Sequence, residues 1–310
     1  MISKVSIIMA TYNRAHLILE TLESIKNQTH QNWECFIIDD GGTDNTFETI
    51  ESVLESDSRF QFVTRPEHYK KGLPGCRNYG IDIASGDYII FFDDDDIVHP
   101  QNLELCLEAF KANTIDFCVY EKTPFFNSTD SIEFQEEMLQ IDKLISKADL
   151  DAIISNAIPM ASCTVMWKKA CFIDIRFNEL LMYAEEWECY PRIISNDKLG
   201  MYLKNTLYFN RKHPDSNTGE FYTKSPIRVH SKKQAINLLV TDLSNKQLLT
   251  PMLLKYFAGL AIAFRDKVLL TDILTISATT TKNKLYLRLK FYLFPLWKIY
   301  KNILKTANLL

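Results

Sequence analysis

The sequence predicts an α/β fold in which helices flank a mostly parallel central sheet, followed by a helical C-terminal region. Three observations support this prediction. Short apolar runs rich in β-branched residues alternate with amphipathic segments over the first 120 residues. Clusters of polar residues follow three of these runs directly, which is typical of the carboxyl ends of strands in open α/β sheets. From Pro226 onward the chain shows helical patterns joined by short breaks.

Five apolar runs in the first 120 residues predict strands, and two more follow later in the chain. Runs that are apolar on both faces are typical of strands in a sheet covered by helices on both sides. The predicted strands are Val5–Ala10, Trp33–Ile38, Phe60–Thr64, Tyr88–Phe92, Ile115–Tyr120, Ala161–Trp167 and Leu203–Phe209.

Amphipathic segments between these strands predict helices. Ile18, Leu22 and Ile25 recur at the spacing of one helix face. Pro100 favours a helix that begins there, because proline is tolerated in the first turn. Strand, helix and strand at this spacing form βαβ units and a mostly parallel sheet. The pattern weakens in residues 121–156, where we expect an insertion or a mobile region.

Composition and charge restrict the class of protein. Hydrophobic residues make up 46% of the 310 residues and charged residues 24%, which excludes a disordered chain. The net charge is −4, but residues 273–310 contain seven Lys or Arg and no Asp or Glu. The rest of the chain is therefore strongly acidic, and we expect no nucleic-acid partner.

Cysteine usage and hydropathy predict the cellular location of the protein. The seven cysteines are an odd number and no pair has CxxC spacing, so we expect reduced, mostly buried thiols. The sequence has no apolar run of about 18 residues and no leader-like N-terminus. We expect a cytoplasmic protein without a transmembrane helix.

The strongest single motif is the run Asp93–Asp96, which follows the fourth predicted strand. Four adjacent carboxylates repel one another unless a cation compensates them. Mg²⁺ is usually held by one or two carboxylates together with substrate phosphates. An acidic helix cap ahead of Pro100 is the alternative, but a cap requires only one carboxylate. We therefore expect Mn²⁺ or Mg²⁺ here, with Asp96 in a structural role.

Two further polar clusters, Thr11–Arg14 and Asp39–Gly42, follow the first and second predicted strands. Six of the nine glycines fall between residues 41 and 86, where the backbone must turn tightly or approach a ligand. The three polar clusters together predict one cleft. Neither GxGxxG after the first strand nor GxxxxGK[ST] is present, which disfavours a Rossmann dinucleotide site and a P-loop. A metal that bridges a diphosphate fits the carboxylates better.

Four sequence blocks, in order, resemble the family 2 inverting glycosyltransferases, which have the GT-A fold. The resemblance covers roughly residues 3–215 and implies a GT-A catalytic domain at 1–225, with a nucleotide-binding half at 1–120 and an acceptor half at 121–225. Residues 226–310 would form a helical region with a basic aromatic tail. The matching blocks are Val5–Arg14, Phe36–Asp44, Gly75–Pro100 and Ala184–Glu188.

The resemblance implies a nucleotide-diphospho-sugar donor, most simply a UDP-sugar, and a hydroxyl of a glycan or lipid-linked glycan as acceptor. Thr11 and Tyr12 would line the nucleotide base, with Arg14 near the phosphates. Asp40 would accept a hydrogen bond from the base, or it could instead cap the next helix. Arg77 would contact base or phosphate, or it could form an ion pair with the aspartate cluster.

The remaining implied roles concern the metal and the diphosphate. Asp95 resembles the direct metal ligand of the DxD motif, and Asp93 belongs to the same motif. Asp93 and Asp94 would also contact the ribose or groups around the metal. Arg211 resembles a basic element that closes over the diphosphate. His213 would be a third metal ligand or a pyrophosphate contact, and a solvated loop histidine is the alternative.

Glu185 and Glu186 stand where the family carries its catalytic base. A carboxylate is required there because the acceptor hydroxyl loses its proton as it attacks the anomeric carbon. Glu186 aligns with the base position, but the sequence leaves open which of the two reaches the acceptor. Both could simply favour a helix N-terminus. We expect Pro191 to interrupt or kink the helix that begins near Ala184.

Two other functions compete with sugar transfer. A nucleotidyltransferase that makes the activated sugar would normally carry a glycine-rich basic loop after the first strand, where this chain has no glycine. A non-catalytic nucleotide-sugar-binding module is opposed by the aspartate run and the glutamate pair. A glycosidase also uses paired carboxylates, but it needs no nucleotide cleft.

Residues 282–305 interleave basic residues with aromatic and aliphatic ones. The uninterrupted apolar stretch Phe291–Trp297 is too short to span a bilayer and contains Pro295. Lys and Arg beside Trp, Phe and Leu are typical of a helix that lies in the membrane interface. We expect peripheral contact with the inner face of the plasma membrane. Packing on the body or between subunits is the alternative.

Overall fold

The computed structural model describes residues 3–126, 129, 132–212, 217–277 and 279–306. The chain forms two compact units, Met1–Lys232 and Lys233–Leu310. The domain boundary predicted from the sequence, between residues 225 and 226, falls at the start of the helix α8 (Pro226–Asn245). The division into units falls inside that helix.

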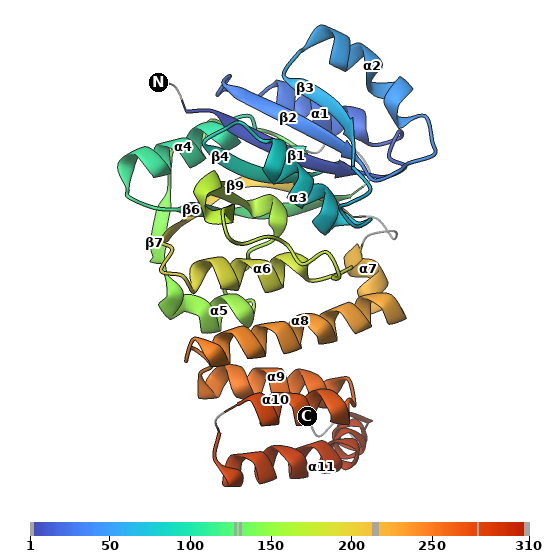
Figure 1. Cartoon of the computed structure of the whole chain (residues 1–310), viewed down its shortest axis with the longest axis vertical. Helices are drawn as coiled ribbons and strands as arrows, with labels where there is room; N and C mark the ends of the chain where they lie inside the picture. The colour runs from blue at the N-terminus through green and yellow to red at the C-terminus, as the bar shows by residue number, and fades with distance from the viewer. Residues whose placement is uncertain (1–2, 127–128, 130–131, 213–216, 278, 307–310) are drawn as a thin grey trace. The chain divides into compact units, whose positions relative to one another are not determined.

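The first unit contains a nine-stranded sheet within the described ranges, with helices packed around it (Figure 1). The strand order is β3-β2-β1-β4-β8-β6-β9-β5, with β7 paired to β9. Neighbours among β1 to β4 are parallel, β8 is antiparallel to β4 and β6, and β6 is parallel to β9. The strands are β1 (Val5–Thr11), β2 (Trp33–Asp39), β3 (Phe60–Thr64), β4 (Tyr88–Asp93), β5 (Ile97–Val98), β6 (Phe117–Phe126), β7 (Ile141–Ile145), β8 (Val165–Lys168) and β9 (Gly200–Lys212).

The helices of this unit bury the apolar faces that their sequence spacing predicts. Ile18, Leu22 and Ile25 of α1 are fully buried against the sheet core. The predicted α/β fold with a mostly parallel, helix-flanked sheet is confirmed. The helices are α1 (Ile18–Lys26), α2 (Thr46–Ser56), α3 (Leu73–Ile83), α4 (Asn102–Ala112), α5 (Leu150–Ile154), α6 (Glu185–Ile194), α7 (Asn217–Tyr222) and α8.

Register brings the polar clusters to one edge of the sheet. Thr11 at the end of β1 lies opposite Asp39 of β2, and Ala10 lies opposite Asp93 of β4. Because these strands are parallel and end at the same level, the residues that follow them meet at their carboxyl ends. All seven cysteines are buried and free, as expected for reduced thiols.

Three local expectations differ from the structure in detail. Residues 121–156 are not simply an insertion, because β6 continues to Phe126 beside β9 and the segment also contains β7 and α5. The strand expected from Ala161 begins only at Val165, after a short 3-10 helix. Helix α6 continues through Pro191 to Ile194. Proline removes only one hydrogen bond of this helix, and buried residues on both sides of Pro191 hold the helix in place.

The second unit is helical, as predicted. It contains the end of α8 with α9 (Pro251–Ala263), α10 (Lys267–Ile276) and α11 (Thr281–Thr306). Side-chain caps start two of these helices, because Thr250 accepts from the Leu253 N–H and Asp266 accepts from the Leu269 N–H. Within the described residues, no helix is both long enough and apolar enough to cross a membrane.

Candidate functional site

A cleft of about 250 Å³ lies in the first unit, at the carboxyl ends of β1 and β4. Its walls are charged and come from segments far apart in the sequence. Nine of the residues singled out from the sequence line this cleft: Arg14, Arg77, Asp93, Asp94, Asp95, Asp96, Glu185, Glu186 and Arg211.

Arg77 of α3 connects the two acidic clusters of the cleft. It is buried, and one guanidinium nitrogen donates to Oε1 of Glu185 at 2.7 Å. The other donates to the Ser162 hydroxyl at 3.0 Å and lies 3.7 Å from Oδ1 of Asp93. Burial opposes the charge of Arg77, but Glu185 and Asp93 outweigh burial and raise its pKa. Arg77 is therefore a fixed cation between the aspartates and the glutamate pair.

The aspartate run contacts Arg14 at the other side of the cleft. The Arg14 guanidinium lies 3.6 Å from Oδ1 of Asp94 and 3.7 Å from Oδ2 of Asp95. Burial, followed by repulsion from Asp95, raises the pKa of Asp94 to about 7. Burial also raises the pKa values of Asp93 and Asp96. Burial and the closeness of the four carboxyl groups therefore favour the protonated forms of Asp93, Asp94 and Asp96, despite the two arginines.

Arg211 of β9 also contacts the loop that holds the aspartate run. Its backbone N–H donates to Oδ1 of Asp96 at 2.7 Å, and its Nε donates to the Asp95 carbonyl at 2.9 Å. Its guanidinium also pairs with Glu20 and lies 4.6 Å from the centre of the Phe125 ring. The contact with Asp96 joins the loop after β4 to the end of β9. His213, two residues further on, lies outside the described residues.

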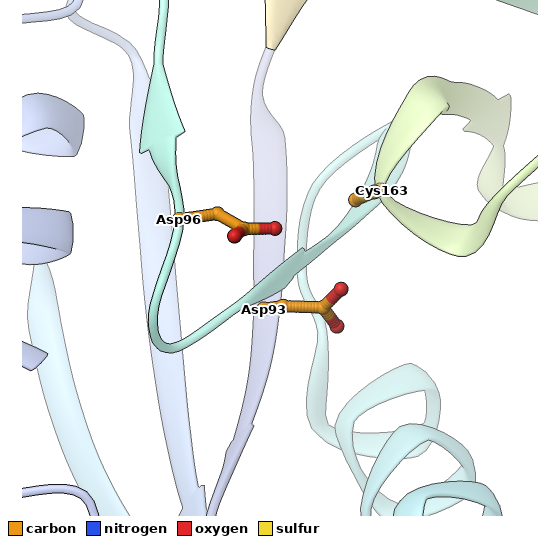
Figure 2. Close-up of side chains that lie close together, drawn as sticks. All are labelled: Asp93, Asp96 and Cys163. Carbon is orange, nitrogen blue, oxygen red and sulfur yellow. The ribbon is translucent and has the colours of Figure 1, made fainter. Parts of the chain in front are cut away.

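The carboxylates fit a hard divalent cation. Among the described residues, Asp93, Asp96 and Cys163 can each place one ligand atom within 4.8 Å of the others. In Figure 2 the side chains of Asp93 and Asp96 extend to the same side, near Cys163. Oδ2 of Asp94 is buried and has no hydrogen-bond partner in the described part of the chain. Oxygen ligands suit Mg²⁺ and Mn²⁺, whereas burial raises the pKa of the Cys163 thiol to about 12 and makes it a poor ligand. Asp95, expected as the direct ligand, belongs to the same run and lies 3.7 Å from Arg14 through its Oδ2.

The two glutamates at the start of α6 have different surroundings. Ala184 precedes them with a left-handed backbone, φ 64°, a strained conformation that is typical of functional turns. Glu185 is buried and bonded to Arg77, whereas Glu186 lines the cleft. Burial, followed by repulsion from Glu185, raises the pKa of Glu186 to about 7. A carboxylate with this pKa can accept a proton near neutral pH.

Residues of α8 hold this turn, and no pattern in the sequence pointed to them. The Ser231 hydroxyl donates to the Tyr183 carbonyl at 2.7 Å and accepts from the Tyr183 N–H at 3.0 Å. The Lys232 ammonium lies 3.1 Å from the centre of the Trp187 ring, and burial lowers the pKa of Lys232 to about 7. The titratable groups that act on or respond to Glu186 are Glu185, Arg77, Lys232, Lys122, Tyr183 and Tyr190.

The residues expected at the nucleotide base lie beside the cleft and do not line it. Thr11 is buried at the end of β1, and Tyr12 is 46% exposed with the Lys71 ammonium 4.3 Å from its ring centre. Asp40 is buried, and its Oδ1 accepts from Arg65 at 2.6 Å. Its Oδ2 accepts from the Gly72 N–H at 2.9 Å. Asp40 therefore joins the end of β2 to the loop before α3.

The chain is similar to curated glycosyltransferases. The chain is 41% identical over 114 residues to the UDP-Glc:alpha-D-GlcNAc-diphosphoundecaprenol beta-1,3-glucosyltransferase WfgD of Escherichia coli, covering 36% of this chain and 43% of WfgD. It is 31% identical over 180 residues to the GalNAc(5)-diNAcBac-PP-undecaprenol beta-1,3-glucosyltransferase of Campylobacter jejuni, covering 57% and 55%. Several other curated glycosyltransferases match over less than a third of their own length.

Solved structures show the same fold. The crystal structure of Staphylococcus aureus TarS 1–349 in complex with UDP superposes with a TM-score of 0.66 at 18% identity, covering 89% of this chain and 81% of that one. The predicted GT-A fold is confirmed. Residues 6–174 match the model of the family described as Glycosyl transferase family 2. This match covers more than half of the 310 residues, and the chain therefore belongs to glycosyl transferase family 2.

Proposed function

We propose that the chain transfers a sugar from a UDP-sugar to a hydroxyl group of a lipid-linked glycan, with inversion at the anomeric carbon. The observation that carries this proposal is the position of Glu186. Its carboxyl group lines the same cleft as Arg14, Arg77 and the aspartate run. A proton acceptor and groups suited to a diphosphate and its cation therefore share one cleft.

The names of similar proteins support the donor and the acceptor class. TarS has been crystallised with UDP and with UDP-GlcNAc, and the name of WfgD gives UDP-Glc as its donor. WfgD and the Campylobacter enzyme are both named for acceptors linked through diphosphate to undecaprenol. In this chain Tyr12, Asp40 and Thr11 would lie at the base, and Arg14 would face the phosphates.

Mn²⁺ or Mg²⁺ bound at the aspartate run would neutralise the diphosphate leaving group. Asp93 and Asp95 would hold the cation as expected from the sequence, and the geometry adds Asp96 as a neighbour of Asp93. Arg77 stays fixed by Glu185 and Ser162. It supplies a permanent positive charge next to Asp93.

Glu186 would act as the general base. Its carboxylate would take the proton of the acceptor hydroxyl while the hydroxyl oxygen bonds to the anomeric carbon and the nucleoside diphosphate leaves. A single displacement of this kind inverts the configuration at that carbon. Glu185 is less suited to this role, because its carboxylate is already engaged by the buried Arg77. The surroundings of the pair thus favour Glu186, the residue that aligns with the base position.

A thermal-shift screen of nucleotide sugars with Mn²⁺ or Mg²⁺, followed by a transfer assay on a polyprenyl-diphosphate-linked sugar, tests the proposal. UDP-sugars should raise Tm only with the metal, and Asp95→Ala should lose that shift. Glu186→Gln should keep the shift and lose transfer by about 10²–10⁴-fold. The exposed Glu55→Gln is the matched control. The proposal fails if no nucleotide sugar raises Tm, or if Glu186→Gln turns over normally.

A further inference from the structure

The helix α11 has an apolar stripe on its outer face. Leu285, Leu289, Tyr292 and Leu293 are each more than half exposed. Their spacing places them on one side of the helix. Leu287 is only 4% exposed and anchors the opposite side within the second unit, where α11 packs against α9 and α10. Large apolar side chains exposed in a continuous stripe mark an interaction surface.

Basic residues border this stripe on both sides. At 3.6 residues per turn, Arg288 lies beyond one edge of the stripe and Lys290 beyond the other, and both are exposed. The Lys267 ammonium of α10 adds a third positive charge, 5.9 Å from the centre of the Tyr292 ring. Residues 273–310 contain no Asp or Glu. On α11 itself, the surface is therefore apolar along its centre and cationic along its rim.

We propose that this face of α11 binds the surface of a bilayer that contains anionic lipids. The leucines and Tyr292 would enter the boundary between headgroups and acyl chains, which lies parallel to the helix axis. Arg288 and Lys290 would extend their charged ends toward the lipid phosphates, as basic side chains do at membrane interfaces. In this arrangement the apolar stripe contacts acyl chains while the basic residues of its rim contact lipid phosphates.

A second copy of the chain fits this face less well. A symmetric dimer through α11 would bring the same patch of both copies together. The basic rim of one copy would then meet the basic rim of the other, and juxtaposed like charges disfavour association. Lipid phosphates carry the opposite charge, and each basic residue near an anionic surface strengthens binding. Charge complementarity therefore selects the anionic bilayer.

Flotation of the full chain with vesicles tests the proposal. The vesicles are phosphatidylcholine alone, or phosphatidylcholine mixed with phosphatidylglycerol. The parent should float with the mixed vesicles and less with the neutral ones. Arg288→Gln/Lys290→Gln should weaken binding to mixed vesicles by about 30-fold, and the parent should lose binding at high salt. Leu285→Ser/Leu289→Ser should weaken binding at least about tenfold.

Matched variants of exposed residues in the first unit are the controls. Lys26→Gln/Lys111→Gln removes the same charge, and Ile173→Ser/Leu180→Ser removes similar exposed apolar area. Both should float like the parent. Equal flotation of the parent and both α11 variants, or no flotation of the parent, overturns the proposal. The proposal is also overturned if the parent is a dimer in analytical ultracentrifugation, Leu285→Ser/Leu289→Ser dissociates that dimer, and neither the parent nor this variant binds vesicles. The readout involves no sugar transfer, so it stands apart from the test of the cleft.

Discussion

Replacing Glu185 with glutamine tests whether Glu185 is the residue that holds Arg77 in place, as its hydrogen bond indicates. Glu185 forms an ion pair with the buried Arg77, and its Oε1 lies 2.7 Å from one guanidinium nitrogen. Glutamine keeps the shape and one acceptor oxygen but removes the charge. Arg77 would then keep only the Ser162 hydroxyl and the more distant Asp93 carboxylate, at 3.7 Å. We therefore expect Glu185→Gln to destabilise the fold.

The size of the loss follows from the burial of the pair. Removing one partner of a buried ion pair costs about 3–5 kcal/mol, because the other charge is left uncompensated. Here the amide oxygen still accepts a hydrogen bond and Asp93 still faces Arg77, so we expect the lower value of about 2–3 kcal/mol. Both Glu185 and Arg77 side chains are less than a tenth exposed, so solvent screens this pair weakly.

Urea unfolding at pH 8 measures the difference, and Glu186→Gln is the internal control. The pKa of Glu186 is raised from 4.5 to about 7 in the folded protein. Its contribution to stability is therefore present below pH 4.5 and lost as the pH rises through 7. Glutamine does not titrate, so Glu186→Gln should be at least as stable as the parent at pH 8. A loss below about 0.5 kcal/mol for Glu185→Gln, or an equal loss for both variants, would refute the reasoning.

Two further predictions concern the base and the backbone. Lys232→Met should move the rising limb of the pH profile of kcat/KM to higher pH, because the ammonium lowers the pKa of Glu186. Lys233→Met removes a lysine that is paired with an aspartate of the second unit, and it should leave the pH profile unchanged. If neither variant moves the rising limb of the profile, Glu186 is not the base that Lys232 influences. Gly80→Ala should destabilise by about 1–3 kcal/mol, because its Cβ would lie 2.4 Å from an isoleucine carbon of β1. At Gly259 an added Cβ would meet nothing within 4 Å, so Gly259→Ala should raise the free energy of unfolding by up to about 1 kcal/mol. If the urea midpoints of both glycine variants shift in the same direction, this explanation from packing is wrong.

The place of the site could be predicted from the sequence because it depends on local features. Apolar runs define the strands, and polar residues follow each run at Thr11, Asp39 and Asp93. The chain direction then brings these strand ends to one edge of a parallel sheet. The register confirms that arrangement. Helices with clear spacing, such as α1, could be predicted for the same reason.

Contacts between distant segments could not be predicted this way. The pairing of β6 with β9 turns polar residues after Glu121 into a strand, although their own pattern is weak. Pro191 remains inside α6 because the helix is held by buried neighbours and not by propensity. In both cases packing outweighs local preference, and packing depends on residues far away in the chain.

The sequence by itself determined the α/β fold, the acidic edge of the sheet and the presence of two carboxylates at the start of α6. Only the tertiary structure decided which carboxylate is already engaged, because that depends on Arg77 of α3 reaching Glu185. It also decided that Ser231 and Lys232 of α8 face the same turn. Hydrogen bonds and charge effects depend on distances of a few ångströms in space. Spacing along the sequence does not give these distances when the residues are brought together only by folding.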